Sequence, residues 1–160
     1  IQERPHILRS LGSAPFDSEG VATVDRDIVK AGILETYLLG SYSARKLGLK
    51  TTGHAGGLHN WFVSKTSPDL ASVLKTMDKG IYVTELMGFG VNGVTGDYSQ
   101  GIAGFWVENG QIQYPIQEVT IAGNLADMFK HIVAIGGDVD KSRNILTGSV
   151  LIEAMTVAGA

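Results

Sequence analysis

The amino-acid sequence predicts an α+β fold, with a large, mostly antiparallel sheet and a few short helices. Two observations lead to this prediction. Twenty-one glycines are dispersed between short apolar runs, a pattern typical of strands joined by tight turns. An Asn-Gly dipeptide, Asn109-Gly110, also separates two strand-like runs, and this dipeptide favours a type I′ hairpin. At 160 residues the chain has the length of one ordinary domain.

Three short helices are expected, near residues 41 to 47, 68 to 78 and 124 to 134. Gly48 closes the first at the position where helices favour glycine. Ser67-Pro68-Asp69 starts the second with a capping serine and a proline at the first helical position. Asn124 can cap the third, and Gly136-Gly137 would stop it.

The remaining apolar runs are predicted to be strands. Residues 33 to 39 form a mostly apolar strand candidate, and residues 81 to 83 follow the second helix. Residues 116 to 121 alternate between apolar and polar side chains, as a half-buried strand does. Residues 145 to 157 are expected to contain a closing strand. Strands are therefore predicted in both halves of the chain.

Composition argues against several classes of protein. The chain has no cysteine, so it cannot form disulfides, thiolate nucleophiles or zinc sites with sulfur ligands. A formal charge of −3 with scattered cations gives no field for nucleic acid. No run reaches the roughly 20 apolar residues of a membrane-spanning helix. The sequence opens on Ile1 rather than Met and without a signal peptide, which predicts a fragment cut from a longer cytoplasmic protein.

The known catalytic motifs are absent or weak. His54 and His59 are close in sequence, but they lie in a glycine-rich segment without a carboxylate, so loop histidines are favoured over a metal site. No Gly-x-Ser-x-Gly pentapeptide is present. The run from Gly88 to Gly93 has the glycine spacing of a dinucleotide-binding loop, but more turn residues follow where a helix would have to begin.

The segment from Thr84 to Gly101 is the most distinctive part of the chain. Five of its eighteen residues are glycine, so its backbone can approach another chain closely, and long polar loops are often functional. We expect it to contact a partner subunit or a peptide substrate. The candidate contact residues are Glu85, Asn92, Asp97, Tyr98 and Ser99.

Long composite motifs in this sequence resemble the TldD/PmbA family of metalloproteases, and specifically the carboxy-terminal domain of its PmbA/TldE branch. They span nearly the whole chain and comprise Phe16-Asp17-Ser18-Glu19-Gly20, the run from Tyr37 to Gly48, the stretch from Thr84 to Gly110, the run from Thr120 to Leu125, and Met155-Thr156-Val157-Ala158-Gly159.

This resemblance implies a cytoplasmic TldD/TldE heterodimer that processes peptides and unfolded proteins, including peptide-antibiotic precursors and labile antitoxins. In such a pair the TldD-type subunit carries zinc through a His-Glu-x-x-x-His motif and a later cysteine. This sequence has neither, so no catalytic, metal or cofactor residue is assigned to it. The family name modulator of DNA gyrase would then describe an indirect effect. An amino-terminal domain is expected to be missing from the chain.

Three hypotheses remain open from the sequence. The first is a noncatalytic subunit domain that binds a TldD-type partner, or forms a homodimer when alone. The second is a self-sufficient peptidase in which Glu85, Asp97 and Glu108 converge as general base or metal ligands. The third is a small-molecule binding module that uses the loop from Gly88 to Gly93.

Overall fold

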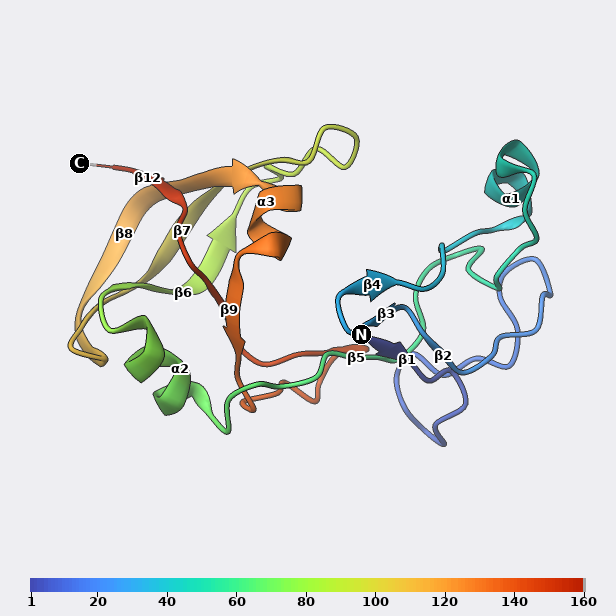
Figure 1. Ribbon diagram of the computed structural model, residues 1–160, viewed down its shortest axis with the longest axis horizontal. Helices are drawn as coiled ribbons and strands as arrows, with labels where there is room; N and C mark the ends of the chain where they lie inside the picture. The colour runs from blue at the N-terminus through green and yellow to red at the C-terminus, as the bar shows by residue number, and fades with distance from the viewer. Residues whose placement is uncertain (160) are drawn as a thin grey trace. The chain divides into compact units, whose positions relative to one another are not determined.

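The computed structural model describes residues 1–159 and divides them into two compact units (Figure 1). Unit 1 comprises residues 1–64 and 139–147, and unit 2 comprises residues 65–138 and the segment from Gly148 onward. The described residues form three helices and twelve strands, and all but one of the strand pairings are antiparallel. The predicted α+β class is confirmed.

Unit 1 is built from two-residue strands and one helix. Its four-stranded sheet has the order β10-β5-β1-β2, with β10 parallel to β5. A separate hairpin pairs β3 with β4, and α1 follows it in the chain. The bounds are β1 Gln2–Glu3, β2 Arg26–Asp27, β3 Val29–Lys30, β4 Ile33–Leu34, α1 Ser41–Leu47, β5 Trp61–Phe62 and β10 Ile145–Leu146.

Unit 2 carries the long strands. Its main sheet has the order β12-β8-β7-β6, a second sheet pairs β11 with β9, and the unit holds two helices. The bounds are α2 Leu70–Met77, β6 Gly80–Met87, β7 Asp97–Glu108, β8 Gln111–Asn124, α3 Leu125–Lys130, β9 Ile132–Ile135, β11 Val150–Ile152 and β12 Thr156–Ala158.

The Asn-Gly hairpin is confirmed as the turn between β7 and β8. Asn109 and Gly110 both have positive φ, at 53° and 68°, as a type I′ turn requires. The turn sets the register, so that Glu108 lies opposite Gln111 and the pairing continues to Asp97 opposite Asn124.

Gly104 lies in the middle of β7, which is flanked on both sides by paired strands.

The core of unit 2 lies between α2 and the small sheet. Val73 of α2, Ala134 of β9 and Leu151 of β11 are buried together, with Met77 packed against them. The helical spacing of Val73 and Met77 puts both side chains on the inner face of α2. In the main sheet, Ile102 and Val107 are completely buried. These contacts hold α2, β9 and β11 together.

The helix predictions are confirmed in part. The first helix spans Ser41–Leu47 as expected, with Gly48 left-handed at its end. The second begins at Leu70, and its cap is Asp69 rather than Ser67, because the Asp69 side chain accepts from the Ser72 N–H. Asn124 caps the third, as predicted, but that helix ends at Lys130.

The strand predictions fail where pairing is decided by distant residues. The segment expected to continue the third helix to residue 134 is instead β9, because Ile132–Ile135 pairs with β11. Of the predicted strand 33 to 39, only β4 forms. The closing segment 145 to 157 holds β10, β11 and β12, each in a different sheet. None of the helices among the described residues has the length and the apolar composition of a membrane-spanning segment.

Candidate functional site

The segment from Thr84 to Gly101 is mostly strand, and only its middle is a connecting loop. Thr84 to Met87 belong to β6 and Asp97 to Gly101 belong to β7. The residues between them, Gly88 to Gly96, are called the hairpin tip from here on; the tip projects beyond the sheet (Figure 1). The antiparallel pairing extends into it, since the Ser99 N–H donates to the Gly90 carbonyl at 2.7 Å and Val91 bridges Tyr98.

The hairpin tip is an ordered turn held by polar side chains of the tip itself and of the adjoining strands β7 and β8. The Asn92 Oδ1 accepts from the N–H groups of Val94 and Thr95 at 2.9 and 3.2 Å. The Thr95 hydroxyl donates to Asp97 Oδ2 at 2.7 Å, and the Asn124 side-chain amide donates to the Thr95 carbonyl. Such side-chain to backbone bonds fix a turn locally. The tip is therefore preorganised.

Four of the predicted contact residues lie in or next to the hairpin tip, and the fifth, Glu85, lies apart from them. Asn92 and Asp97 meet at the base of the turn, and Tyr98 and Ser99 follow in β7. Tyr98 is half-buried, and burial raises the pKa of its hydroxyl. Glu85 is exposed but lies in β6 opposite Ala103, apart from the other four. The structure thus gives Asn92 and Asp97 a role in building the tip.

Sequence reasoning missed the two side chains that the tip presents. Phe89 and Val94 are essentially fully exposed, at 105% and 96% of their reference areas. Large apolar side chains on an ordered turn cost solvation free energy and are typical of contact surfaces. The available signal was the presence of Phe and Val among the glycines and Asn of a turn, where polar residues prevail.

The geometry does not provide the arrangement of residues that either alternative hypothesis requires. Asp97 and Glu108 are the first and last residues of β7, roughly 36 Å apart along a strand that rises about 3.3 Å per residue. These acids cannot converge on one site with Glu85. The loop from Gly88 to Gly93 joins two antiparallel strands instead of leading into a helix, so it lacks the anion-binding helix terminus of a dinucleotide site.

Unit 1 contains a buried polar cluster that the sequence did not reveal. The Glu3 carboxylate, 1% exposed, accepts from the Trp61 indole N–H at 3.0 Å and from the His59 backbone N–H at 3.1 Å. The His54 Nε2 lies 2.8 Å from the second carboxylate oxygen, and the Arg26 Nε lies 3.7 Å from it. We call Glu3, Arg26, His54, His59 and Trp61 the Glu3 cluster.

The Glu3 cluster does not fit a metal ion. The two nitrogens of His54 face Glu3 and the Thr52 hydroxyl, and the His59 Nε2 faces the Gly53 carbonyl at 3.0 Å. Two N–H groups point at the carboxylate, where a cation would have to bind. Within residues 1–159, no group of three or more His, Cys, Asp or Glu side chains could hold a metal.

Asp17 ties the first family motif to the glycine-rich segment. Its Oδ1 accepts from the N–H groups of Glu19 and Val21, both at 2.9 Å, and its Oδ2 accepts from the Ala55 N–H at 3.0 Å. Burial raises the pKa of Asp17, but these three backbone bonds and the nearby His59 together lower it below its ordinary value of 3.8. The ionised form is therefore favoured by folding.

We expect unit 1 to lose stability in acid through Asp17. A carboxyl group whose pKa is lowered by folding stabilises the fold above its unfolded pKa, and that contribution disappears as the pH falls below 3.8 toward the folded value. Thermal melts of the unsubstituted protein and of Asp17→Asn, recorded from neutral pH to below pH 3.8, measure the effect. The difference between their melting temperatures should be largest near neutral pH and shrink in acid; parallel curves would contradict the assignment.

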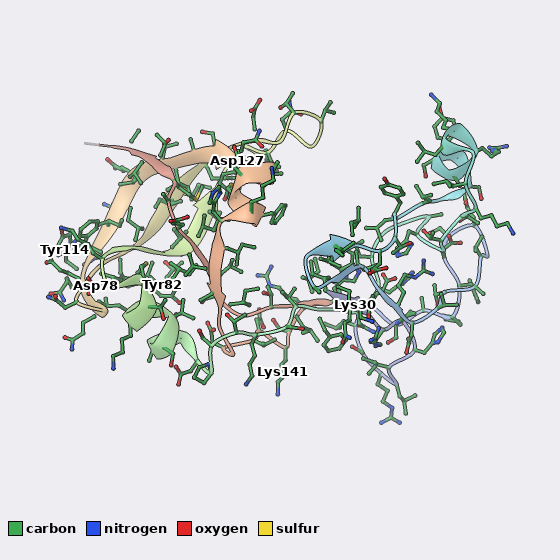
Figure 2. The ribbon with its side chains drawn as sticks, in the orientation of Figure 1. Lys30, Asp78, Tyr82, Tyr114, Asp127 and Lys141 are labelled. Atoms are coloured by element: carbon green, nitrogen blue, oxygen red, sulfur yellow. The ribbon has the colours of Figure 1, made fainter. Side chains whose placement is uncertain are left out.

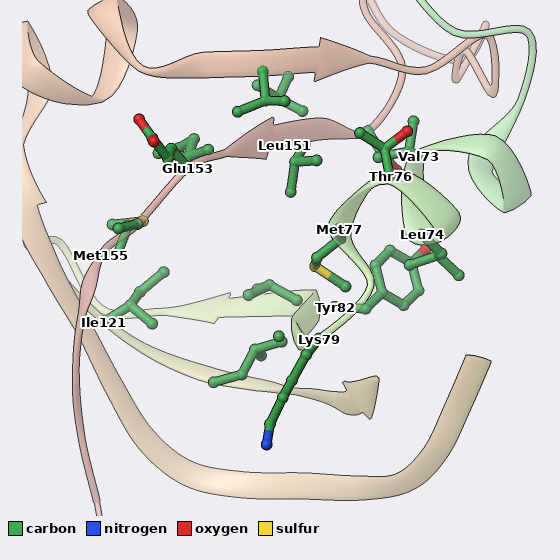
Figure 3. A pocket seen from close by; sticks show the side chains of 18 of the residues that line it. Val73, Leu74, Thr76, Met77, Lys79, Tyr82, Ile121, Leu151, Glu153 and Met155 are labelled. Carbon is green, nitrogen blue, oxygen red and sulfur yellow. The ribbon is translucent and has the colours of Figure 1, made fainter. Parts of the chain in front are cut away.

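Unit 2 contains an apolar cavity of about 860 Å³ between α2, the main sheet and the β9–β11 pair. In Figure 3, Met77, Ile121, Leu151 and Met155 surround a common space, whereas Lys79 extends away from it. Three of the four methionines of the chain are among the residues lining it, and methionine adapts readily to irregular apolar surfaces. The lining suits apolar contact rather than acid–base chemistry.

Comparison with known proteins gives a consistent family. A family model described as the PmbA/TldA metallopeptidase C-terminal domain matches residues 1–159. The chain is 60% identical to Metalloprotease PmbA of Escherichia coli O157:H7 across 99% of its own length and 35% of that protein. It is 25% identical over 144 residues to a Metalloprotease TldD homologue of Buchnera aphidicola. The chain thus spans about a third of the length of these relatives.

Solved structures superpose on nearly the whole of this chain. A candidate modulator of DNA gyrase from Bacteroides thetaiotaomicron superposes with a TM-score of 0.90 at 33% identity, over 99% of this chain and 36% of that one. TldE from Thermococcus kodakarensis superposes with a TM-score of 0.78 at 22% identity, over 99% of this chain and 39% of that one, and shows the same fold.

Proposed function

Because this chain belongs to the PmbA/TldA metallopeptidase C-terminal domain family, we propose that it is a noncatalytic subunit domain of a TldD/TldE-type heterodimeric zinc metalloprotease. The observation that carries the proposal is the 60% identity to Metalloprotease PmbA over nearly the whole chain. The existence of both TldD and TldE proteins among its relatives supports a two-subunit assembly.

The residues of this chain support a noncatalytic role. A peptidase metal needs His, Cys or carboxylate ligands around one open position, and residues 1–159 bring no three such groups together. The proposal therefore places the zinc in the TldD-type partner. Peptides and unfolded proteins, among them peptide-antibiotic precursors and antitoxins, are the proposed substrates, and the cytoplasm is the proposed location.

The hairpin tip is the proposed contact with the partner or the substrate. Its turn is fixed before binding by Asn92, Thr95 and Asp97, so little conformational entropy would be lost on contact. Phe89 and Val94 supply apolar side chains that gain from burial. Buried aromatic anchors commonly dominate the binding energy of protein interfaces.

Hydrolysis of casein or a peptide by the full-length protein, alone and mixed with a TldD-type partner, tests the proposal when zinc content is read in parallel. We expect activity and zinc only in the mixture. Activity and stoichiometric zinc in the protein alone would overturn the noncatalytic role. If neither sample is active but the two proteins still co-elute, the peptidase part of the proposal is wrong.

A double variant, Phe89→Ser with Val94→Ser, tests the hairpin tip in the same mixture. Loss of two exposed anchors should weaken assembly or substrate binding by roughly tenfold. The matched control is Ile112→Ser with Tyr114→Ser, which removes two exposed apolar side chains from β8 just after the β7–β8 turn. Tyr114 lies well apart from Asp127 of α3 in this unit (Figure 2). Equal effects of the two double variants would count against a specific role for the tip.

A further inference from the structure

Charge is unevenly divided between the two units. Unit 1 holds nine Lys and Arg against seven Asp and Glu, whereas unit 2 holds four against nine. The formal charge of −3 for the whole chain therefore conceals a positive unit and a strongly negative one. Within unit 1, the segment from Tyr37 to Lys50 carries Arg45, Lys46 and Lys50 and no acidic residue.

Two of these cations, Arg45 and Lys46, share one face of α1 with an aromatic ring. Tyr42, Arg45 and Lys46 are spaced at i, i+3 and i+4, so they lie together on the helix surface, opposite the buried Ala44. Tyr42 is 65% exposed, and the Lys46 ammonium lies 5.4 Å from the centre of its ring. Tyr37, Leu47 and Leu49 add further exposed apolar surface, each about half exposed or more. We call this set, with Lys50, the α1 surface.

Hydrogen bonds fix the backbone that carries the α1 surface. The Glu19 carboxylate accepts from the Ser41 N–H at 2.8 Å, and the Thr52 hydroxyl accepts from the Leu39 N–H at 2.7 Å. The Leu49 N–H donates to the Ala44 carbonyl at 2.9 Å. The exposed side chains therefore project from an ordered backbone. Glu19 is the acid that neighbours this surface, and its hydrogen bonds to Ser41, together with nearby Arg45, lower its pKa.

We infer that the α1 surface binds an acidic peptide segment that also carries aromatic or aliphatic side chains. Three cations with no acidic residue in the segment fit an anionic partner, and exposed Tyr and Arg are the side chains that protein interfaces favour. A protein that binds duplex nucleic acid typically contacts about 6–10 phosphates, and a protein that binds anionic membranes typically uses a cluster of about 4–8 Lys and Arg. The small number of cations and the exposed apolar area favour a peptide.

Binding of an acidic peptide is inferred from the α1 surface itself. Only the further step, that such peptides are substrates of the protease, rests on the proposed function. The experiment measures fluorescence anisotropy of a short labelled peptide of Glu, Gly and Phe titrated with the full chain. Arg45→Glu with Lys46→Glu should weaken binding by about tenfold at low salt, and salt near 0.15 M should reduce the difference. The matched control, Lys75→Glu with Lys130→Glu, changes the net charge equally on exposed positions of unit 2 and should leave binding unchanged.

Several outcomes would overturn the inference. They are equal binding by the Arg45 and Lys46 double variant, equal binding of a peptide with Lys in place of every Glu, and binding of phosphatidylserine vesicles or duplex DNA in preference to the acidic peptide. Arg45→Gln with Lys46→Gln, checked by circular dichroism, separates loss of charge from loss of folding. No hydrolysis and no partner are needed, so a failure here is distinguishable from failure of the proposed two-subunit protease.

Discussion

Replacing Glu3 with alanine is expected to destabilise unit 1 by roughly 3–5 kcal/mol, the usual effect of removing one partner of a buried charged pair. The substitution leaves the indole N–H of Trp61, the backbone N–H of His59 and the ring of His54 without their acceptor. It also leaves the Arg26 side chain, 15% exposed, without its ion-pair partner. Each buried donor left unpaired costs about 1–3 kcal/mol.

Urea denaturation measures this loss, and in a Trp106→Phe background the fluorescence reports on Trp61 alone, because the chain has two tryptophans. Glu35→Ala is the matched control, since Glu35 is exposed and should cost less than about 0.5 kcal/mol. Glu3→Gln keeps one acceptor oxygen and should fall between the two. A loss for Glu3→Ala no larger than that for Glu35→Ala would show that the Glu3 cluster does not stabilise the unit.

The Glu3 cluster also shows what could not be predicted from the sequence. Glu3 meets His54 and Trp61 across 51 and 58 positions of the chain, and nothing local marks a glutamate in a two-residue strand as buried. His54 and His59 were correctly expected to lie in a glycine-rich loop, but their burial against Glu3 depends on how β1 pairs with β5. Contacts of this kind are set by tertiary structure.

Elements with local determinants were predictable. Asn109-Gly110 fixed its hairpin because both residues tolerate positive φ, and α1 ends where Gly48 adopts a left-handed conformation. By contrast, β9 follows α3 almost directly, and its apolar residues continue the helical pattern until pairing with β11 decides otherwise. The glycines predicted a loop from Thr84 to Gly101, of which only the hairpin tip is a loop, and they did not indicate that Phe89 and Val94 are exposed.

Replacing Gly104 with valine is expected to destabilise unit 2 by at least about 3 kcal/mol, at the upper end of overpacking costs. Gly104 is buried in β7 between Val83 of β6 and Ile116 of β8. A Cβ atom there would collide with the Tyr82 carbonyl and lie 3.0 Å from the Val83 Cα. Both of these atoms belong to the backbone of β6, so a side chain at this position fits only if β6 and β7 move apart. The pairing of β7 with β6 and with β8 is already irregular next to Gly104.

Gly93→Ala is the matched control, because no atom lies within 4 Å of a Cβ placed at Gly93, and an exposed change of this kind should cost less than about 0.5 kcal/mol. Hydrogen–deuterium exchange of the β7 amides, read beside the denaturation curves, locates the damage. Fast exchange confined to unit 2 in Gly104→Val would show that close approach of β6 and β7 holds the sheet together. Unchanged protection would mean that the strands can shift to admit a side chain, and glycine at this position would then need a different explanation.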